Sequence, residues 1–490
     1  MGEGLELRLD EISREFTMHS QFVSAPIVCS WSGLFFYHSF SLTFALLVCG
    51  GNGLAKGAEK PNIIFVLFDD MGYGQPPSYR ADTEFHTPNL ERLTREGMRF
   101  TDAHSASAVC TPTRYGVLTG RYPWRIGQYG VLTTYSAPII PASRPTVASL
   151  LKQQGYHTAC IGKWHLGMNW DGGKPGNESQ LPLGATMKNG PNAVGFDYFY
   201  GFTHARNIGS IIEQDRVVAQ VEPVENQPLM LKKALAYLEE RAQAGSPFFL
   251  YFPMCPPHTP IVPAAEFAGK GTTKDLSSKD KAYSDWLYQG DAMLGQIMET
   301  LERLKLAENT LLIATSDNGA EQREYPPLRA AKRSIYEGGH RVPFVARWPG
   351  KVKAGSVNHH TICLNDLLAT SAEIVGAPIP PAAGEDSVSL LPHLFDPAQT
   401  GKREATVHQS MAGDLAIRQG PWKLVFLKNG IKELYNLETD IREKQNVAAS
   451  NVEIANKLTK LLQSYVDRGR STPGAEQENG VEVSLPQGKN

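Results

Sequence analysis

The stretch NIIFVLF, residues 62–68, is followed directly by Asp69 and Asp70. An unbroken apolar run of this length is typical of a strand that is buried on both faces, as in a parallel sheet. Ligands of open parallel sheets bind beyond the carboxyl ends of the strands, and the two carboxylates stand at such an end. The stretch therefore predicts a central strand whose end carries two acidic side chains.

Other apolar runs of strand length recur along the chain and alternate with amphipathic stretches. The runs are YHTACI from Tyr156, PFFLYF from Pro247, TLLIATS from Thr310 and PFVARW from Pro343. Helices are expected over residues 89–97, 146–154, 228–243 and 283–305. This alternation predicts an α/β fold with a large mixed, mostly parallel sheet sandwiched by helices.

The chain has 490 residues, which is too long for one ordinary core, so a large domain with a smaller companion is expected. We assign the large domain to residues 59–400. From residue 401, short polar strands and a helical stretch at 452–466 predict a smaller C-terminal antiparallel sheet plus helix over residues 401–468. Residues 469–490 are rich in Gly, Ser, Glu and Gln and are predicted to form a loose tail.

Residues 1–58 are interpreted as a leader with a signal peptide. The apolar segment 34–48 is shorter than the ~20 residues of a membrane span, and small residues follow it. The acidic residues that precede it are unusual for a signal peptide, which makes Met18 an alternative start. An uncleaved anchor or lipid attachment at Cys49 are rival interpretations. We predict a secreted or periplasmic, cell-envelope protein without a stable membrane span in the mature chain.

Charge and cysteine content narrow the class of protein. The formal net charge of −2 provides no broad basic surface, so nucleic acid is not expected as a partner, and an anionic ligand would need a local cluster of cations. The cysteines outside the leader are widely scattered, which argues against a disulfide framework. None of them forms a CxxC pair, which argues against a zinc site and thioredoxin-like chemistry. These scattered cysteines are Cys110, Cys160, Cys255 and Cys363.

Polar side chains follow four of the predicted strands at the point where each strand ends. They are Asp69 and Asp70, then Lys163 and His165, then His258, and finally Asp317 and Asn318. Taken singly, each has an ordinary explanation, such as a helix cap, a turn or a surface histidine. Together, oxygen ligands after two strands and cationic donors after two others favour a site that binds a metal and an anion.

The residue types at this edge indicate which metal and which anion. The oxygen ligands are Asp69, Asp70, Asp317 and Asn318, a set without thiolate or imidazole. Such hard ligands favour Ca²⁺ or Mg²⁺ over zinc, and we expect Ca²⁺. The remaining donors, Lys163, His165, His258 and Lys332, suit a tetrahedral anion on which charge builds up. The site is therefore expected to transfer phosphate or sulfate.

A further motif separates these two options. Cys110-Thr-Pro-Thr-Arg114, continued by Leu-Thr-Gly-Arg at residues 118–121, resembles the signature of the type I sulfatases, the formylglycine-dependent branch of the alkaline phosphatase superfamily. The alternative is a buried free cysteine ahead of a helix with proline in its first turn. The resemblance extends over residues 62–447 and includes IIFVLFDDMGYG, GKWHLG, PPHTP, SDNGAE and KRSIYEGGHRVP. Ala331 replaces the glycine that usually precedes the lysine in the last block.

The resemblance implies an alkaline phosphatase-like fold and a modified active-site residue. Cys110 would be oxidised to formylglycine (3-oxoalanine) by a formylglycine-generating enzyme, and its hydrate would offer two hydroxyls on one carbon, one to attack sulfur and one to release sulfate. Arg114 and Lys163 would hold this hydrate. The implied calcium ligands are Asp69, Asp70, Asp317, Asn318 and the modified Cys110.

The resemblance also implies roles in proton transfer. Asp317 would take the proton of the attacking hydroxyl. His258, with Lys332, would protonate the departing alcohol, and His165 would take the proton of the second hydroxyl. The implied substrate-binding residues are Lys163, His258 and Lys332.

The substrate is expected to be a sulfated small molecule or glycan. The YPWRIG segment after the signature and the WKLVF…ELYNL segment are most similar to relatives of arylsulfatase A and N-acetylgalactosamine-6-sulfatase, which implies a sulfated carbohydrate. Three loop residues, His204, Arg206 and Arg323, are candidates for sugar contacts or solvated loop charges. Two alternatives remain: a phosphodiesterase or phosphonate hydrolase of the same superfamily, and a catalytically silent protein that binds sulfated glycans.

Overall fold

The computed structural model describes residues 60–485 except 175, 322 and 400. The leader predicted for residues 1–58 and the last residues, 486–490, therefore lie outside the described part. Within that part, no helix combines the length and the apolar character needed to cross a membrane.

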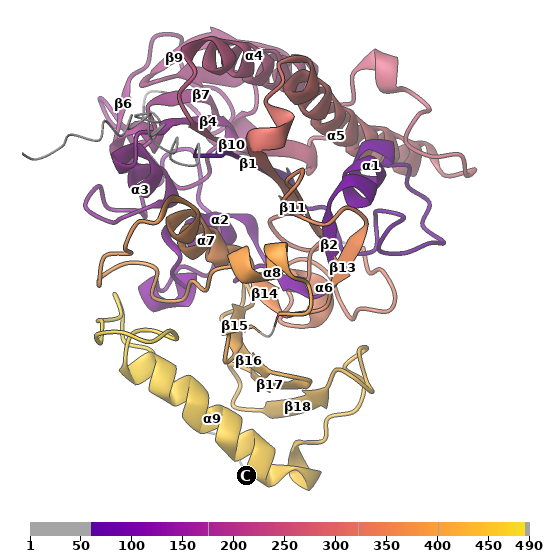
Figure 1. Ribbon diagram of the computed structural model, residues 1–490, viewed down its shortest axis with the longest axis vertical. Coiled ribbons are helices and arrows are strands. Elements are labelled where there is room, and N and C mark those ends of the chain that lie inside the picture. The colour runs from indigo at the N-terminus through magenta and orange to yellow at the C-terminus, as the bar shows by residue number, and fades with distance from the viewer. Residues whose placement is uncertain (1–59, 175, 322, 400, 486–490) are drawn as a thin grey trace, which may run out of the picture. The chain divides into compact units, whose positions relative to one another are not determined.

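A large mixed sheet forms the centre of the molecule, as the alternation of strands and helices predicts (Figure 1). Its strands run in the order β13-β2-β12-β11-β1-β10-β4-β7-β8-β9. The central strands are parallel: β11 (Thr310–Ser316), β1 (Asn62–Asp69), β10 (Phe248–Pro257), β4 (His157–Lys163) and β7 (Tyr198–Phe202). The strands toward the edges are β12 (Phe344–Arg347), β2 (Met98–Phe100), β13 (Ser356–Asn358), β8 (Ser210–Glu213) and β9 (Arg216–Gln220). All these edge pairings are antiparallel except that of β13 with β2.

Helices cover both faces of this sheet, which explains the unbroken apolar sequence of β1. Side chains of a strand point alternately to the two faces. Ile63, Phe65 and Leu67 lie in one buried cluster, whereas Ile64, Val66 and Phe68 lie in the other. The first cluster includes α2 (Cys110–Thr119), α3 (Val147–Gln153) and α7 (Leu367–Val375). The second includes α1 (Pro88–Glu96), α4 (Pro223–Ala244) and α5 (Ser278–Arg303).

Shorter elements complete the part built around the large sheet. Two small ladders pair β3 (Ala103–His104) with β14 (Ile362–Cys363), and β5 (Asn169–Trp170) with β6 (Met187–Lys188). The short helices are α6 (Glu337–His340) and α8 (Leu391–Phe395).

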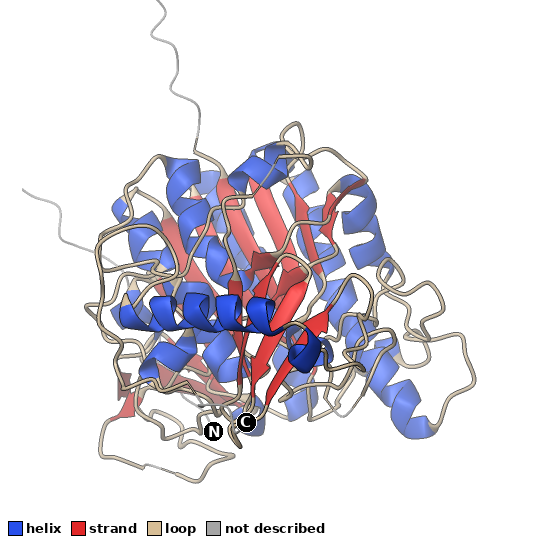
Figure 2. Cartoon of the chain, turned by 90° about the horizontal axis from the view of Figure 1, so that it is seen from below, coloured by secondary structure: helices blue, strands red, loops and turns tan. Residues whose placement is uncertain are grey.

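The C-terminal part forms the small antiparallel sheet with a helix that the sequence predicts. Its strands are β15 (Thr406–Gln409), β16 (Leu415–Gln419), β17 (Trp422–Phe426) and β18 (Lys432–Asn436). Helix α9 (Val452–Asp467) packs Leu458, Leu462 and Tyr465 onto apolar side chains of this sheet. The helix lies in front in Figure 2, where the molecule is seen from below. Residues 60–485 fall into one compact unit, so the division near residue 400 remains a prediction.

Residues 469–485 differ from the loose tail expected there. Two buried arginines hold this segment: Arg121 donates to the carbonyl oxygen of Glu478 at 2.7 Å, and Arg125 donates to Oδ1 of Asn479 at 2.9 Å. The backbone N–H of Gly480 also donates to the carbonyl oxygen of Arg125 at 2.7 Å. Polar composition suggested a loose tail, but hydrogen bonds to buried charged groups hold this segment, and Val483 and Leu485 pack against the apolar cluster under α9.

Candidate active site

The structure brings the predicted site residues together at the carboxyl end of the parallel strands. Asp69 and Lys163 are the last residues of β1 and β4, while His258 and Asp317 directly follow β10 and β11. Cys110 begins α2, and its Sγ lies within 4.8 Å of carboxylate oxygens of Asp69 and Asp317. Residues distant in sequence thus share one site because their strands are neighbours in the sheet.

Two oxygen atoms at this site are buried without a hydrogen-bond partner among the described residues, although Oδ1 of Asp69 lies 3.5 Å from a terminal nitrogen of Arg114. Oδ1 of Asp69 and Oδ1 of Asn318 accept no hydrogen bond from any described residue. Buried polar atoms are nearly always hydrogen-bonded, so each unpaired oxygen indicates a place for a ligand. Carboxylate and amide oxygens are the ligands that Ca²⁺ and Mg²⁺ prefer. The residues therefore fit a hard divalent cation.

Asp70 is held in an unusual backbone conformation at the centre of this network. Its φ of 71° lies in the left-handed region, which costs free energy for a residue with a side chain. Its N–H donates to Oδ1 of Asp317 at 3.1 Å, and its Oδ1 accepts from Nδ2 of Asn318 at 2.7 Å. These bonds hold Asp70 in place beside the end of β1.

Two buried lysines lie against the carboxylates. Nζ of Lys163 contacts Asp69, and Nζ of Lys332 lies 2.6 Å from Oδ1 of Asp70 and 3.2 Å from Oε2 of Glu321. Burial alone would lower the pKa of each lysine, but the neighbouring carboxylates raise both above the usual value. Both side chains therefore stay positively charged and can bind an anion.

The thiol of Cys110 is poorly suited to act as a thiolate. Only 1% of Cys110 is exposed, and burial raises the pKa of its thiol although Lys163 and Lys332 act in the opposite direction. Reactive cysteines instead have a lowered pKa and partial exposure. A nucleophile at this position would therefore need a different chemical group from the thiol.

His165 is placed as a neutral base. Its Nε2 lies 3.0 Å from the carbonyl oxygen of Leu132 and must donate to it, which leaves the lone pair on Nδ1. That Nδ1 is buried with no partner in the described part of the chain. Burial and the charge of Lys163 hold the pKa of His165 well below its usual value, so the ring is neutral and can accept a proton at Nδ1.

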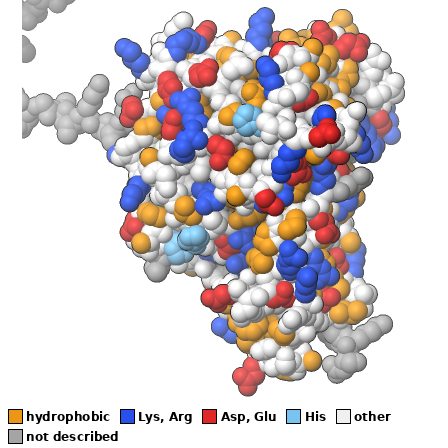
Figure 3. Space-filling model, turned by 90° about the vertical axis from the view of Figure 1, so that its right-hand side faces the viewer, with side chains coloured by type: hydrophobic (Ala, Val, Ile, Leu, Met, Phe, Trp, Pro, Cys, Tyr) orange, Lys and Arg blue, Asp and Glu red, His pale blue; other side chains and the backbone are white. Residues whose placement is uncertain are grey.

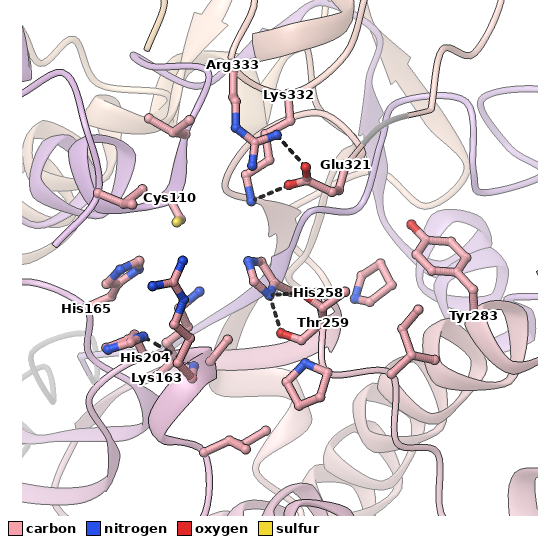
Figure 4. A pocket seen from close by; sticks show the side chains of 18 of the residues that line it. Cys110, Lys163, His165, His204, His258, Thr259, Tyr283, Glu321, Lys332 and Arg333 are labelled. Atoms are coloured by element: carbon pink, nitrogen blue, oxygen red, sulfur yellow. Dashed lines mark hydrogen bonds and ion pairs between the residues drawn. The ribbon is translucent and has the colours of Figure 1, made fainter. Parts of the chain in front are cut away.

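His258 borders the opening of the site. Its Nε2 lies 3.7 Å from Oδ2 of Asp70, and 19% of its side chain is exposed. Burial lowers its pKa, whereas the carboxylates of Asp69 and Asp70 act in the opposite direction. Figure 4 shows His258 beside the same opening as Cys110, His165 and Lys332. Of the predicted catalytic residues, Cys110, Lys163, His165, His258 and Lys332 line one pocket. Arg114 does not line it, but its guanidinium lies 2.8 Å from Asp317.

A pocket of about 1200 Å³ opens onto these residues. All three predicted loop residues, His204, Arg206 and Arg323, contribute to its lining. The ring of His204 stacks on that of His165, and the guanidinium of Arg323 lies over Tyr283 at 4.3 Å. On the molecular face shown in Figure 3, acidic and basic side chains are interspersed, in keeping with the small net charge.

The sequence indicated residues 321–329 as a loop that lines the substrate pocket, but it gave neither Glu321 nor Arg333 a role in the site. Both line the pocket, and the carboxylate of Glu321 contacts Arg333 as well as Lys332 (Figure 4). One feature of the sequence could have indicated Glu321: it follows Asp317 and Asn318 in the SDNGAE block directly after β11. Which way its side chain points depends on the fold of that loop, which the sequence pattern does not reveal.

Comparisons with known proteins agree with this geometry. The family described as Sulfatase matches residues 61–377, and the family described as N-sulphoglucosamine sulphohydrolase, C-terminal, matches residues 330–468. The chain is 31% identical to an N-acetylgalactosamine-6-O-sulfatase of Bacteroides thetaiotaomicron, over 84% of this chain and 94% of that protein. It is 32% identical to human arylsulfatase A, over 79% and 78% of the two chains.

A solved structure is similar over nearly its whole length. It is a Bacteroides thetaiotaomicron protein described with the metabolism of multiple glycosaminoglycans, with a TM-score of 0.74, 29% identity, and coverage of 83% of this chain and 99% of that chain. The alkaline phosphatase-like fold implied by the sequence is thereby confirmed. With a family match across more than half of its length, the chain belongs to the sulfatase family and is a sulfuric ester hydrolase.

Proposed function

We propose that this hydrolase cleaves sulfate esters of carbohydrates at a formylglycine made from Cys110 beside a bound Ca²⁺. The observation that carries the proposal is the position of Cys110 within 4.8 Å of both Asp69 and Asp317, next to the unpaired oxygens of Asp69 and Asn318. The poor reactivity expected of the buried thiol supports a modified residue.

Ca²⁺ and formylglycine would supply chemistry that the unmodified side chains of the site do not offer. Bound Ca²⁺ would hold sulfate oxygens and make the attacking hydroxyl easier to ionise. Formylglycine would supply a carbon with two hydroxyls in place of a thiol. The Asp69, Asp70, Asp317 and Asn318 side chains, with the modified residue, are the proposed calcium ligands.

The chain's own residues would orient the groups and move protons. Arg114 lies against Asp317, and its other terminal nitrogen donates to the carbonyl oxygen of Lys163 at 3.0 Å, which fixes it beside Cys110. Lys163, His258 and Lys332 would bind the sulfate. Burial and the charge of Asp69 raise the pKa of Asp317, which suits an acceptor for the proton of the attacking hydroxyl.

Protonation of the departing alcohol and deprotonation of the second hydroxyl, which becomes the aldehyde oxygen again, would use different histidines. His258 and Lys332 border the pocket, so they are placed to protonate the departing alcohol. His165 presents an unprotonated Nδ1, so it is placed to take the proton of the second hydroxyl. These roles separate an acid near the pocket opening from a base within the buried site.

The proposal includes the protein's surroundings. The relative named N-acetylgalactosamine-6-O-sulfatase supports a sulfated sugar as substrate. Maturation would require a formylglycine-generating enzyme, and the signal-like segment at residues 34–48 supports export to the periplasm or cell exterior.

An ester comparison tests this proposal. Protein produced with a formylglycine-generating enzyme is assayed on aryl sulfate, aryl phosphate and a panel of sulfated sugars. We expect the unmutated protein to cleave the sulfate ester and Cys110→Ala to lose this activity. We also expect the intact mass of the unmutated protein to be about 18 Da lower than the mass calculated for an unmodified Cys110. Preference for the phosphate ester would replace the proposal with a phosphohydrolase. Glycan binding without turnover, at the unmodified mass, would identify a silent binding protein.

A further inference from the structure

A second, smaller pocket adjoins the proposed catalytic pocket. It measures about 480 Å³ and shares four lining residues with the larger one. The shared residues are Ser179, Arg206, Ile208 and Pro223. A ligand longer than one sugar can therefore reach from the catalytic pocket into the smaller pocket along these shared residues, Arg206 among them.

The charge of Arg206 is available to such a ligand. Two other arginines line the catalytic pocket, and each contacts a carboxylate: Arg323 contacts Asp280, and Arg333 contacts Glu321. The guanidinium of Arg206 has no hydrogen bond or ion pair with the residues that the structure describes, and the residue is exposed. An incoming anion would thus gain a charge-assisted contact without breaking an existing pair.

The backbone of Arg206 is nevertheless firmly held. Its N–H donates to Nδ1 of His204 at 3.3 Å, and Nε2 of His204 lies 2.9 Å from Oγ1 of Thr134. Burial, followed by the charge of Lys163, lowers the pKa of His204 to about 4, so its ring stays neutral and can accept the N–H. The neighbouring Asn207 is fully buried. This support fixes where the guanidinium can reach.

The rest of the smaller pocket suits hydroxyl groups. Its exposed amide and carboxylate side chains are those of Gln180, Gln220, Glu222 and Glu225. Amides and carboxylates bind sugar hydroxyls, whereas the two glutamates would repel an anion placed beside them. Any anionic group of a bound sugar is therefore directed to the side on which Arg206 lies.

We propose that the smaller pocket is a subsite for the sugar next to the sulfated one, and that Arg206 binds an acidic group of that sugar. The acidic group is a carboxylate, since its two oxygens match the fork of a guanidinium. The inference rests on the proposed function and specifies its substrate as an acidic oligosaccharide of at least two units.

A ratio of specificities tests this inference. For each variant, kcat/KM is measured on two disaccharides with the same sulfated sugar, one with a neutral neighbour and one with a uronic acid. Arg206→Gln should lower the acidic-to-neutral ratio about tenfold, the scale of one charge-assisted contact, and Arg206→Lys should restore part of it. Arg303→Gln removes an exposed arginine of α5 outside both pockets and should leave the ratio unchanged.

Two further measurements separate this inference from the proposed function. Turnover of aryl sulfate by the unmutated protein tests the proposed function alone. Binding of the two disaccharides, without sulfate, to the Cys110→Ala protein tests the subsite without any turnover. The inference is overturned if Arg206→Gln changes kcat/KM and binding affinity equally for the two disaccharides. It is also overturned if the substitution changes neither quantity for either of them.

Discussion

The guanidinium of Arg114 lies 2.8 Å from Oδ2 of Asp317, and both side chains are entirely buried. The same guanidinium donates to the carbonyl oxygen of Lys163 at 3.0 Å. Arg114 therefore connects the ends of β4 and β11. It lies four residues after Cys110 in α2, so the two side chains stand one turn apart on the same face of the helix. The Cys-x-Pro-x-Arg spacing thus places the modified residue and its charged support together.

Replacing Arg114 should affect activity and stability differently according to the new side chain. Lysine has one nitrogen and cannot contact Lys163 and Asp317 as a planar fork does, so Arg114→Lys should fold but lose about 100-fold in kcat/KM. In the calcium-free protein, Arg114→Met leaves Asp317 buried beside Asp69 without its guanidinium and should cost about 3–5 kcal/mol in the free energy of unfolding. Urea unfolding and turnover measure the two effects. Equal stability of the Met variant and the unmutated protein would contradict this account.

Calcium should stabilise the protein as well as activate it. Chelation should abolish sulfate turnover, and added Ca²⁺ should restore it. Since Ca²⁺ binds the folded site, 100-fold excess over Kd should raise the free energy of unfolding by about 2.7 kcal/mol. Asp69→Asn should lose this gain. As a control, Asp291→Asn changes a buried carboxylate that caps α1 and should retain it. If added Ca²⁺ still raised the free energy of unfolding of Asp69→Asn, the assignment of Asp69 as a calcium ligand would be wrong.

The sequence predicted β1, β4, β10 and β11 and their ends because both depend on local pattern, but it missed the fifth central strand, β7. The start of α4 was misplaced for a physical reason. Pro228 was taken as its first residue, whereas the helix begins at Pro223 and contains Pro228 in its interior. In the first turn the side chain of Glu225 accepts from the N–H of Glu222 at 2.9 Å, and Pro223 loses no hydrogen bond there. A proline that begins a helix and one that interrupts it look alike when only the sequence is read.

Contacts that depend on tertiary structure were beyond the sequence pattern. Glu321 belongs to a quoted block, yet only the folded loop turns its carboxylate toward Lys332. The ordering of residues 469–485 likewise depends on Arg121 and Arg125, which lie far away in the sequence. The candidate site was predictable because parallel strands bring their ends together whatever the loops do.

A buried histidine cluster should make the protein unstable in acid. The rings of His340 and His408 stack at 4.0 Å, and Nδ1 of His104 lies 3.0 Å from Nδ1 of His340. Burial, followed by neighbouring imidazoles and Lys423, holds the pKa of His340 and of His408 well below 6.5. The unfolded chain then binds more protons than the folded one, so the free energy of unfolding should fall as pH drops below about 6.5.

This prediction is tested by measuring how steeply the free energy of unfolding changes with pH. Each histidine kept neutral by folding contributes up to about 1.4 kcal/mol per pH unit. His408→Gln should therefore reduce the slope between pH 6.5 and 5 by about that amount, whatever its effect at pH 7. His359→Gln, a change at an exposed position, should leave the slope as it is. An unaltered slope in His408→Gln would show that this ring is protonated in the folded protein.

The ion pair of Arg125 with Asp386 should be among the most sensitive points of the fold. Asp386 accepts from Nε and from a terminal nitrogen of Arg125, each at 2.8 Å, and both side chains are fully buried. Asp386→Ala leaves a buried guanidinium without a counter-charge and should cost about 3–5 kcal/mol. Asp82→Ala breaks the exposed pair with Arg80 and should cost about 1 kcal/mol or less.

Hydrogen exchange should show where this destabilisation acts. Arg125 also donates to Oδ1 of Asn479, and Asp386 accepts from the N–H of Ser471, each within residues 469–485. Because these hydrogen bonds tie the segment directly to the ion pair, Asp386→Ala should increase amide exchange there before it does so in β1. If Asp386→Ala and Asp82→Ala proved equally stable, or if exchange rose uniformly, burial of the pair would not be what holds the segment in place.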